Sequence, residues 1–237
     1  MITTQRKTFV IGDVHGMLQP LKNLLAKLPS DANIVFTGDL CDRGLYSANV
    51  IKLVRDSGYK TVLGNHENTF ISFFEDYFSG MSYDDVTTKW AMWLLANGGS
   101  ETLQSYGIKD GKLPSNKALE QIKNDIEWMK SLPIYLELDA LHHTKLPVVV
   151  SHSNITHVWH LREDKEEFDY FKDIATRGRD LSYNRDSNIV NIFGHTPTKK
   201  LNKNSYCINV DSGCCYQEDG LGKLTAYCVE DDEFIVV

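Results

Sequence analysis

Five apolar runs of this chain each end at a short motif that carries Asp, Asn or His, and this arrangement limits the fold more than any other feature. The motifs are GDVHG at 12–16, GDLCDRG at 38–44, GNHE at 64–67, SHS at 151–153 and GHTP at 194–197. A single such motif is usually a solvated turn, whereas five at the ends of predicted strands indicate one shared site. Open α/β sheets carry their sites at the carboxyl ends of strands, and these side chains bind divalent metals. The pattern predicts an α/β fold with a metal site at one sheet edge.

Strands and helices alternate at the start of the chain. Runs rich in β-formers at 8–11, 33–37 and 59–63 are separated by segments at 18–28 and 47–55 whose apolar residues recur at helical spacing. This β-α-β-α-β order predicts parallel strands joined by right-handed crossovers.

The segment from about 68 to 132 has a different character and is predicted to be an all-helical insertion packed beside the sheet. Four helices are expected, at 67–78, at 84–96, shortly after 98, and at 115–132. The aromatic residues of this segment, Trp90 and Trp93 among them, are more typical of a core than of a ligand platform.

Strands return after Pro133. The runs at 134–138 and 141–144 are expected to pair as a hairpin, and further strands are expected at 147–151, 188–193, 206–210, 223–229 and 234–237, the last two antiparallel. Alternation followed by a run of strands predicts two packed sheets flanked by helices. Residues 1–237 are interpreted as one domain that contains the insertion.

Composition excludes several classes of protein. The chain of 237 residues is long enough for one well-buried core, and its formal net charge of −7 argues against nucleic-acid binding, which needs a basic face. Its apolar runs are too short to span a membrane, and residues 1–7 hold no apolar stretch of signal-peptide length, so a cytoplasmic protein is expected. The five cysteines lack framework spacing and are expected to be free thiols. A monomer is favoured.

The five motifs resemble the PPP family of metal-dependent phosphoprotein phosphatases, within the wider calcineurin-like metallophosphoesterases. The family pattern is GDxHG, GDxxDRG, GNHE, a lone His after a strand, and GHT. Residues 8–67 match it continuously, whereas 147–152 and 189–213 match it in short pieces. The compact length is similar to that of the small bacterial-type serine/threonine phosphatases. The resemblance implies a four-layer αββα sandwich, here with a helical insertion.

The resemblance also implies two divalent metal ions. The implied ligands are Asp13 and His15 for the first ion, Asp39 as the bridge, and Asn65, His152 and His195 for the second. Two ions neutralise phosphoryl oxygens and activate water at neutral pH. Mixed imidazole and carboxylate ligands favour manganese, with iron or zinc next in order, over magnesium.

Three neighbouring side chains are implied to act on the substrate. His66 takes the family role of general acid towards the leaving alkoxide, and Asp42 orients it. Arg43 offers a planar fork to two phosphate oxygens. The resemblance also implies a second phosphate-binding arginine upstream of the GHT motif. A turn of small residues at 175–179 carries both Arg177 and Arg179, and Arg177 is favoured because it best fits the family's placement.

Several other residues compete for these roles. Arg185 is a further candidate for the phosphate, but little chain separates it from the strand that ends in GHT. Ser153-Asn154 follow His152 where many family members carry small residues. The competing histidines lie in a hairpin or a polar loop and are interpreted as non-ligands: His142, His143, His157 and His160. Cys41 is interpreted either as a redox-regulatory thiol or as a small buried hydrophobe.

The leading hypothesis is metal-dependent hydrolysis of phosphomonoesters on phosphorylated proteins, at Ser or Thr and also Tyr. The alternative is hydrolysis of dinucleoside polyphosphates such as diadenosine tetraphosphate, but relatives with that activity usually end the third motif in Asp, whereas Glu67 stands here. A third hypothesis is a non-catalytic metal-binding regulatory module. Such a module would lack one of the implied metal ligands or the general acid, and this sequence has all of them. A small phosphoester is a further candidate substrate in place of a phosphoprotein.

Overall fold

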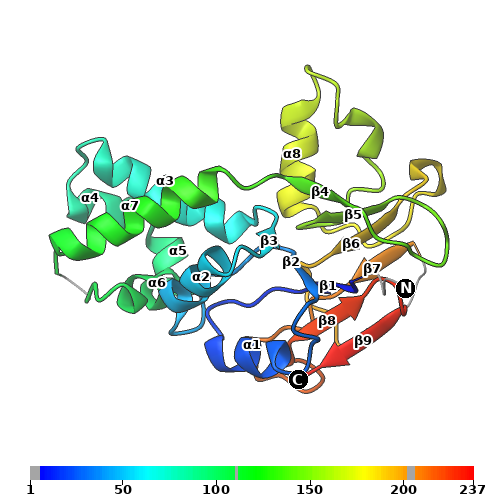
Figure 1. Ribbon diagram of the computed structural model, residues 1–237. Coiled ribbons are helices and arrows are strands. Elements are labelled where there is room, and N and C mark those ends of the chain that lie inside the picture. The colour runs from blue at the N-terminus through cyan, green and yellow to red at the C-terminus, as the bar shows by residue number, and fades with distance from the viewer. Residues whose placement is uncertain (1–5, 110–111, 202–205) are drawn as a thin grey trace.

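The computed structural model describes residues 6–109, 112–201 and 206–237 and shows two β-sheets with helices outside them (Figure 1). Within this part of the chain, one sheet has the strand order β3-β2-β1-β8-β9 and the other the order β4-β5-β6-β7. The α/β fold class is therefore confirmed.

The first sheet begins as expected. Its parallel strands are β1 (Thr8–Ile11), β2 (Asn33–Phe36) and β3 (Lys60–Thr61), joined by α1 (Leu18–Leu25) and α2 (Ser47–Asp56). It is completed by the antiparallel strands β8 (Thr225–Cys228) and β9 (Glu233–Val236). β3 is shorter than expected because the backbone N–H of Leu63 donates to Pro133 instead of to the neighbouring strand.

The second sheet differs from the expected pairing. It contains β4 (Tyr135–Leu138), β5 (Val148–Ser151), β6 (Val190–Phe193) and β7 (Cys207–Asn209). β4 pairs antiparallel with β5, so the hairpin expected between 134–138 and 141–144 is wrong. The segment 141–144 forms a turn because the buried imidazole of His142 bonds to Thr144 at 2.8 Å and to the hydroxyl of Tyr227 at 3.0 Å.

Three hydrophobic clusters mark the layers. Val10, Val35, Val148 and Ile192 belong to a cluster made of residues from both sheets. A second cluster joins the outer face of the first sheet to α1, α2 and the insertion, and a third joins β5 to α8 (Phe168–Arg177) and the single-turn helix η1 (Trp159–Leu161). Helices thus cover the outer face of each sheet, as an αββα sandwich requires. α8 was not expected, because only the acidic run before it stands out in the sequence.

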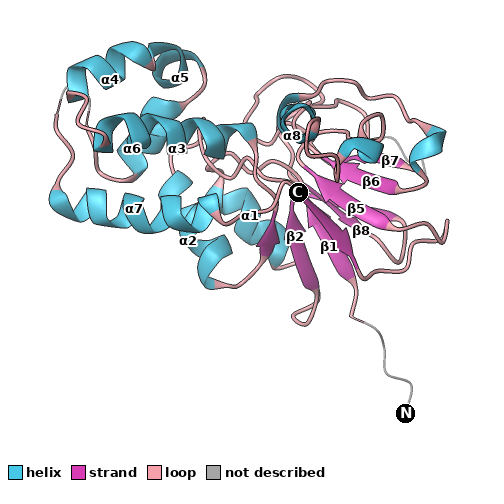
Figure 2. Cartoon of the chain, turned by 90° about the horizontal axis from the view of Figure 1, so that it is seen from above, coloured by secondary structure: helices cyan, strands magenta, loops and turns pink. Residues whose placement is uncertain are grey.

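The insertion is helical, as expected, and lies to one side of the sheets (Figure 2). Its helices are α3 (Asn65–Phe78), α4 (Tyr83–Lys89), α5 (Ala91–Ala96), α6 (Gly99–Ser105) and α7 (Asn116–Lys130). The single helix expected at 84–96 is broken at Trp90, whose backbone leaves the helical region with φ −102° and ψ 21°. Within the described ranges, no helix is both long and apolar enough to span a membrane.

A buried ion pair fastens the insertion to α2. The carboxylate of Asp125 on α7 is fully buried, pairs with the guanidinium of Arg55 on α2, and accepts a hydrogen bond of 2.9 Å from Tyr106. Burial raises the pKa of Asp125, so the arginine is needed to keep this carboxylate charged.

Replacing Arg55 with Met should lower the free energy of unfolding by about 3 kcal/mol, because it leaves a buried carboxylate without its cation. Lys52→Met is the matched control, since Lys52 pairs with the exposed Asp56 on the same helix, and its loss should cost about 0.5 kcal/mol or less. Urea unfolding of both variants measures the difference. Equal losses in the two variants would show that the buried pair does not hold the insertion.

Candidate active site

The five motifs meet at the carboxyl ends of the strands. Within the described residues, two groups of candidate ligand atoms lie within 4.8 Å of one another there: His15, Asp39 and His66, and Asp39, His152 and His195. Asp39 belongs to both groups. A carboxylate shared by two clusters is the arrangement that a pair of bridged metal ions needs.

In the second group, nitrogen and oxygen atoms that carry lone pairs lie close to one another. The Nδ1–H of His152 donates to the carbonyl of Thr37 at 2.7 Å, which in the neutral imidazole leaves a lone pair on Nε2. This Nε2 lies 3.0 Å from Asn65 Oδ1, 3.0 Å from Nδ1 of His195 and 3.4 Å from Asp39 Oδ1. Acceptors packed this closely repel one another unless a cation lies between them, so the residues fit a divalent metal.

His195 supports the same interpretation. Burial lowers the pKa of His195 to about 3, so its imidazole is neutral and can bind a metal. Among the described residues, its Nε2 is buried without a hydrogen-bond partner.

The first group differs in one member from the implied set. The Nδ1–H of His15 donates to the carbonyl of Cys41 at 2.8 Å, and its Nε2 accepts a hydrogen bond of 2.7 Å from the Arg43 guanidinium and lies 3.6 Å from Asp39 Oδ2. His66 is the third member of this group, whereas Asp13 lies outside it and accepts hydrogen bonds of 3.0 Å from Thr37 and from the backbone of His195.

The motif loops are strained. Non-glycine residues with positive φ in these motifs are His15, Asp39, Asp42, Arg43 and His195, with φ between 48° and 71°. Each such residue costs about 1–3 kcal/mol and persists only where its surroundings hold it. Gly194 allows the close approach of the Asp13 carboxylate, because a Cβ at this position would lie 2.1 Å from one of its oxygens.

Glu67 holds two of these loops together. Its buried carboxylate accepts backbone N–H groups from Asp39 at 2.8 Å, Leu40 at 2.8 Å, Cys41 at 3.4 Å and Gly64 at 3.1 Å. These bonds tie the loop after β2 to the start of α3. The carboxylate is therefore occupied with backbone groups of the two loops.

His66 and Asp42 form a buried pair. The Nδ1 of His66 lies 2.6 Å from Asp42 Oδ2, and Asp42 is fully buried. Burial lowers the pKa of His66, but the charges of Asp39 and Asp42 outweigh it, so the pKa is raised overall. The charged imidazolium is thereby favoured, and its Nε2–H can donate a proton.

A small cavity of about 110 Å³ opens beside this pair. It is lined by Asp39, Arg43, Asn65, His66, Thr69, Trp93, Asn97, Arg179 and His195. Thr69, Trp93 and Asn97 were not expected in the site. The glycine pair that follows Asn97 was the available signal, because glycines next to a polar residue often mark a close approach of two backbones.

The arginines are distributed differently from the expected assignment. α8 continues through Arg177, whose exposed guanidinium pairs with Asp173 at 3.2 Å. Arg179 lies beyond the end of the helix and lines the cavity. Arg185 lines a separate cavity with Tyr183. The turn expected around Arg177 is a helix, and for this reason the geometry favours Arg179.

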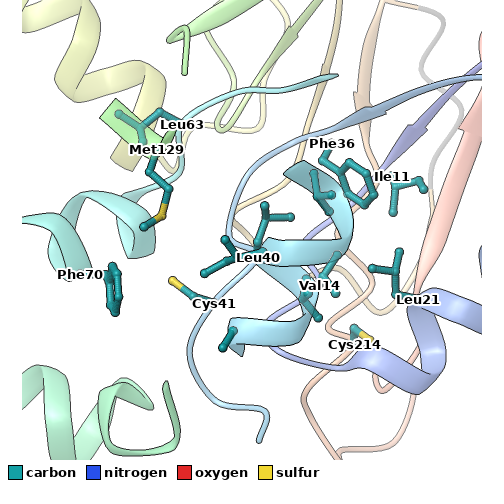
Figure 3. Close-up of a cluster of buried hydrophobic side chains, with 14 of the residues drawn as sticks. Ile11, Val14, Leu21, Phe36, Leu40, Cys41, Leu63, Phe70, Met129 and Cys214 are labelled. Atoms are coloured by element: carbon teal, nitrogen blue, oxygen red, sulfur yellow. The ribbon is translucent and has the colours of Figure 1, made fainter. Parts of the chain in front are cut away.

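The surroundings of Cys41 favour one of its two interpretations. Cys41 is fully buried among apolar side chains near Phe70 (Figure 3), and burial raises the pKa of its thiol well above the usual value. Both observations favour the small buried hydrophobe over the redox-regulatory thiol.

A third group of candidate ligands lies away from the five motifs. It joins His142, His143 and Asp232, of which His143 is exposed, and the ring nitrogens of His142 bond to Thr144 and Tyr227. His142 is therefore occupied in holding the turn at 141–144.

Comparison with known proteins identifies the family. The family model described as calcineurin-like phosphoesterase matches residues 6–219. The chain belongs to the calcineurin-like phosphoesterase family. It is accordingly a metallophosphoesterase, a hydrolase of phosphate esters.

Curated relatives carry a more specific name. "Bis(5'-nucleosyl)-tetraphosphatase PrpE [asymmetrical]" of Oceanobacillus iheyensis is 28% identical over 98% of this chain and 92% of its own length. The protein of the same name from Bacillus cereus (strain AH187) is 27% identical over 96% of this chain and 92% of its own length.

Solved structures support the fold. A candidate diadenosine tetraphosphatase has a TM-score of 0.61 at 20% identity and covers 100% of this chain and 95% of its own. A serine/threonine phosphatase from Saccharomyces cerevisiae has a TM-score of 0.60 at 15% identity, over 99% of this chain and 80% of its own. At these identities the two structures are evidence for the fold alone.

The expectation of a phosphoprotein phosphatase is wrong, because these full-length curated relatives are named as tetraphosphatases. The expectation came from the resemblance of the five motifs to phosphoprotein phosphatases, and Glu67 served only to set the tetraphosphatase alternative aside. Its carboxylate instead binds backbone N–H groups and does not line the cavity.

Replacing Glu67 with Asp should lower the free energy of unfolding by about 2 kcal/mol, because the shorter side chain cannot reach all its N–H donors. The ratio of kcat/KM between two different phosphate esters should stay unchanged. Glu75→Asp on the exposed face of α3 is the control and should change neither quantity. A changed preference between the esters would return Glu67 to the specificity-determining residues.

Proposed function

We propose that this chain hydrolyses dinucleoside polyphosphates asymmetrically with the help of two divalent cations. The observation that carries the proposal is the position of Asp39 in both ligand groups. The substrate class is supported by the names of the curated relatives, which match almost the whole chain.

The proposed ligands fall on either side of Asp39. His15 and Asp13 serve one ion, and Asn65, His152 and His195 serve the other. Bound there, two ions would neutralise phosphoryl oxygens and lower the pKa of water. The imidazole-rich set favours manganese, with iron or zinc next in order.

The arginines recognise the phosphate chain in this proposal. Arg43 and Arg179 both line the cavity beside His66 and each offers a planar fork of N–H donors. The Cζ of Arg43 lies 5.1 Å from the centre of the Tyr216 ring, which supports one face of the guanidinium. Two arginines match a polyphosphate better than one arginine would, because the phosphate chain between the two nucleosides carries several negative charges.

As a water molecule attacks phosphorus and the bond from phosphorus to the leaving oxygen breaks, His66 gives its Nε2 proton to that oxygen, and Asp42 holds the ring through Nδ1. A leaving phosphate chain is a weaker base than an alkoxide. The acid therefore contributes less to cleavage of a polyphosphate than to cleavage of an alkyl phosphate, where about 10²–10⁴-fold is typical.

The direct test is product analysis with diadenosine tetraphosphate, with manganese added. Adenosine triphosphate and adenosine monophosphate should form in equal amounts, and kcat/KM should exceed that for a phosphoserine peptide. Asp39→Asn is the inactive control. Adenosine diphosphate as sole product, or preference for the peptide, would contradict the proposal.

Arg179→Ala should lower kcat/KM by about 10–100-fold, since it removes charged hydrogen bonds to phosphate. Arg177→Ala should stay within about twofold, because that side chain makes an exposed pair on α8. Metal content of both variants should equal that of the wild type. If Arg177→Ala shows the large loss and Arg179→Ala does not, the assignment is reversed.

A further inference from the structure

The insertion supplies two donors to the carboxylate of Asp42. The indole Nε1–H of Trp93 on α5 donates to Asp42 Oδ2 at 2.7 Å, and the hydroxyl of Thr102 on α6 donates to Oδ1 at 2.6 Å. His66 approaches Oδ2 at 2.6 Å. The carboxylate is thus held by two fixed donors while it orients the imidazole.

Thr102 fixes the backbone of Asp42 as well. Its hydroxyl oxygen accepts the backbone N–H of Asp42 at 2.8 Å while its proton goes to the Asp42 carboxylate. Asp42 has φ 71°, a conformation that a non-glycine residue keeps only when neighbours hold it. Thr102 therefore holds both the side chain and the strained backbone of this residue.

The Trp93 ring is itself rigidly placed. It is 3% exposed and packs against Phe73 with ring centres 4.9 Å apart. A Cβ on Gly99 would lie 2.5 Å from the indole, so the chain passes directly over the ring. The indole N–H is an obligatory donor, and when buried it needs a partner.

The same segment touches the phosphate-binding arginine. The backbone N–H of Arg43 donates to the carbonyl of Gly98 at 3.3 Å, and a Cβ on Gly98 would come within 2.0 Å of that nitrogen. The turn between α5 and α6 is thus packed onto the Asp42-Arg43 loop.

We infer that Trp93 and Thr102 are positioning residues that hold Asp42 so that His66 is aligned with the leaving group. The inference rests on the proposed acid role of His66 but not on which phosphate ester is the natural substrate. The α5–α6 segment of the insertion thus helps to align the proposed acid, in addition to packing in the hydrophobic core.

The test uses a series of substituted phenyl phosphates, from good to poor leaving groups, with metal-saturated protein. Trp93→Phe and Thr102→Val should each lower kcat about tenfold or more for the poorest leaving group, with little loss for the best and an unchanged KM. Thr102→Ser keeps the hydroxyl and should behave as wild type. Trp90→Phe is the matched control, because that indole donates to Asp76, within the insertion and away from the pair.

A second measurement does not depend on turnover. In the metal-free protein, the Nδ1 proton of His66 should give a protected downfield NMR signal in the wild type, Thr102→Ser and Trp90→Phe. It should broaden by exchange in Trp93→Phe and Thr102→Val, because a loosened carboxylate holds the proton less well.

Equal losses across the whole phenyl phosphate series, or an unchanged NMR signal in Trp93→Phe and Thr102→Val, would overturn the inference and leave a merely structural role. Failure to cleave diadenosine tetraphosphate, with the phenyl phosphate slopes as expected, would reject the proposed substrate and keep the inference.

Discussion

The hydrogen bonds from backbone N–H groups to the carboxylate of Glu67 are the interaction on which the site depends. They join the loop that carries Asp39 and Asp42 to the turn that carries Asn65 and His66. A hydrogen bond to a charged group contributes about 1.5–3 kcal/mol, so several together offset the left-handed strain of about 1–3 kcal/mol at Asp39 and again at Asp42. This anchor fixes the two halves of the site relative to each other, together with the pair of His66 and Asp42.

From that anchor the site extends in two directions. Towards the sheets, His152 and His195 come from the ends of β5 and β6 and meet Asp39. Towards the insertion, Trp93 and Thr102 contact the carboxylate of Asp42. The proposed metal ligands thus depend on the αββα sandwich, and the proposed acid depends on the helices beside it.

The sequence was most informative where function is local. A side chain that directly follows a parallel strand must lie at the sheet edge, so one shared site for the five motifs could be predicted from the residues alone, whereas the grouping of Asp39 with His152 and His195 was implied by the family resemblance. The spacing of apolar residues predicted β1, β2 and β6 and the helical character of the insertion. These are consequences of periodicity and of the fixed handedness of crossovers.

What the sequence did not reveal depends on long-range hydrogen bonds. Periodicity shows that Trp93 faces a core, but not that its N–H meets Asp42, 51 positions away in the chain. Glu67 is a second example. From the sequence alone it is interpreted as a residue that distinguishes substrates, because nothing near it in the sequence shows that its carboxylate binds backbone N–H groups. Arg177 was preferred to Arg179 from the family's placement and from small residues that suggest a turn. The position at which α8 ends depends instead on the burial of Phe171 and Ala175 against the second sheet, which the local sequence does not show.

The most direct test of the shared role of Asp39 is anomalous diffraction at the manganese edge from crystals grown with manganese. Two peaks should flank the Asp39 carboxylate, one beside His15 and one beside His152 and His195. A single peak, or peaks away from Asp39, would contradict the account.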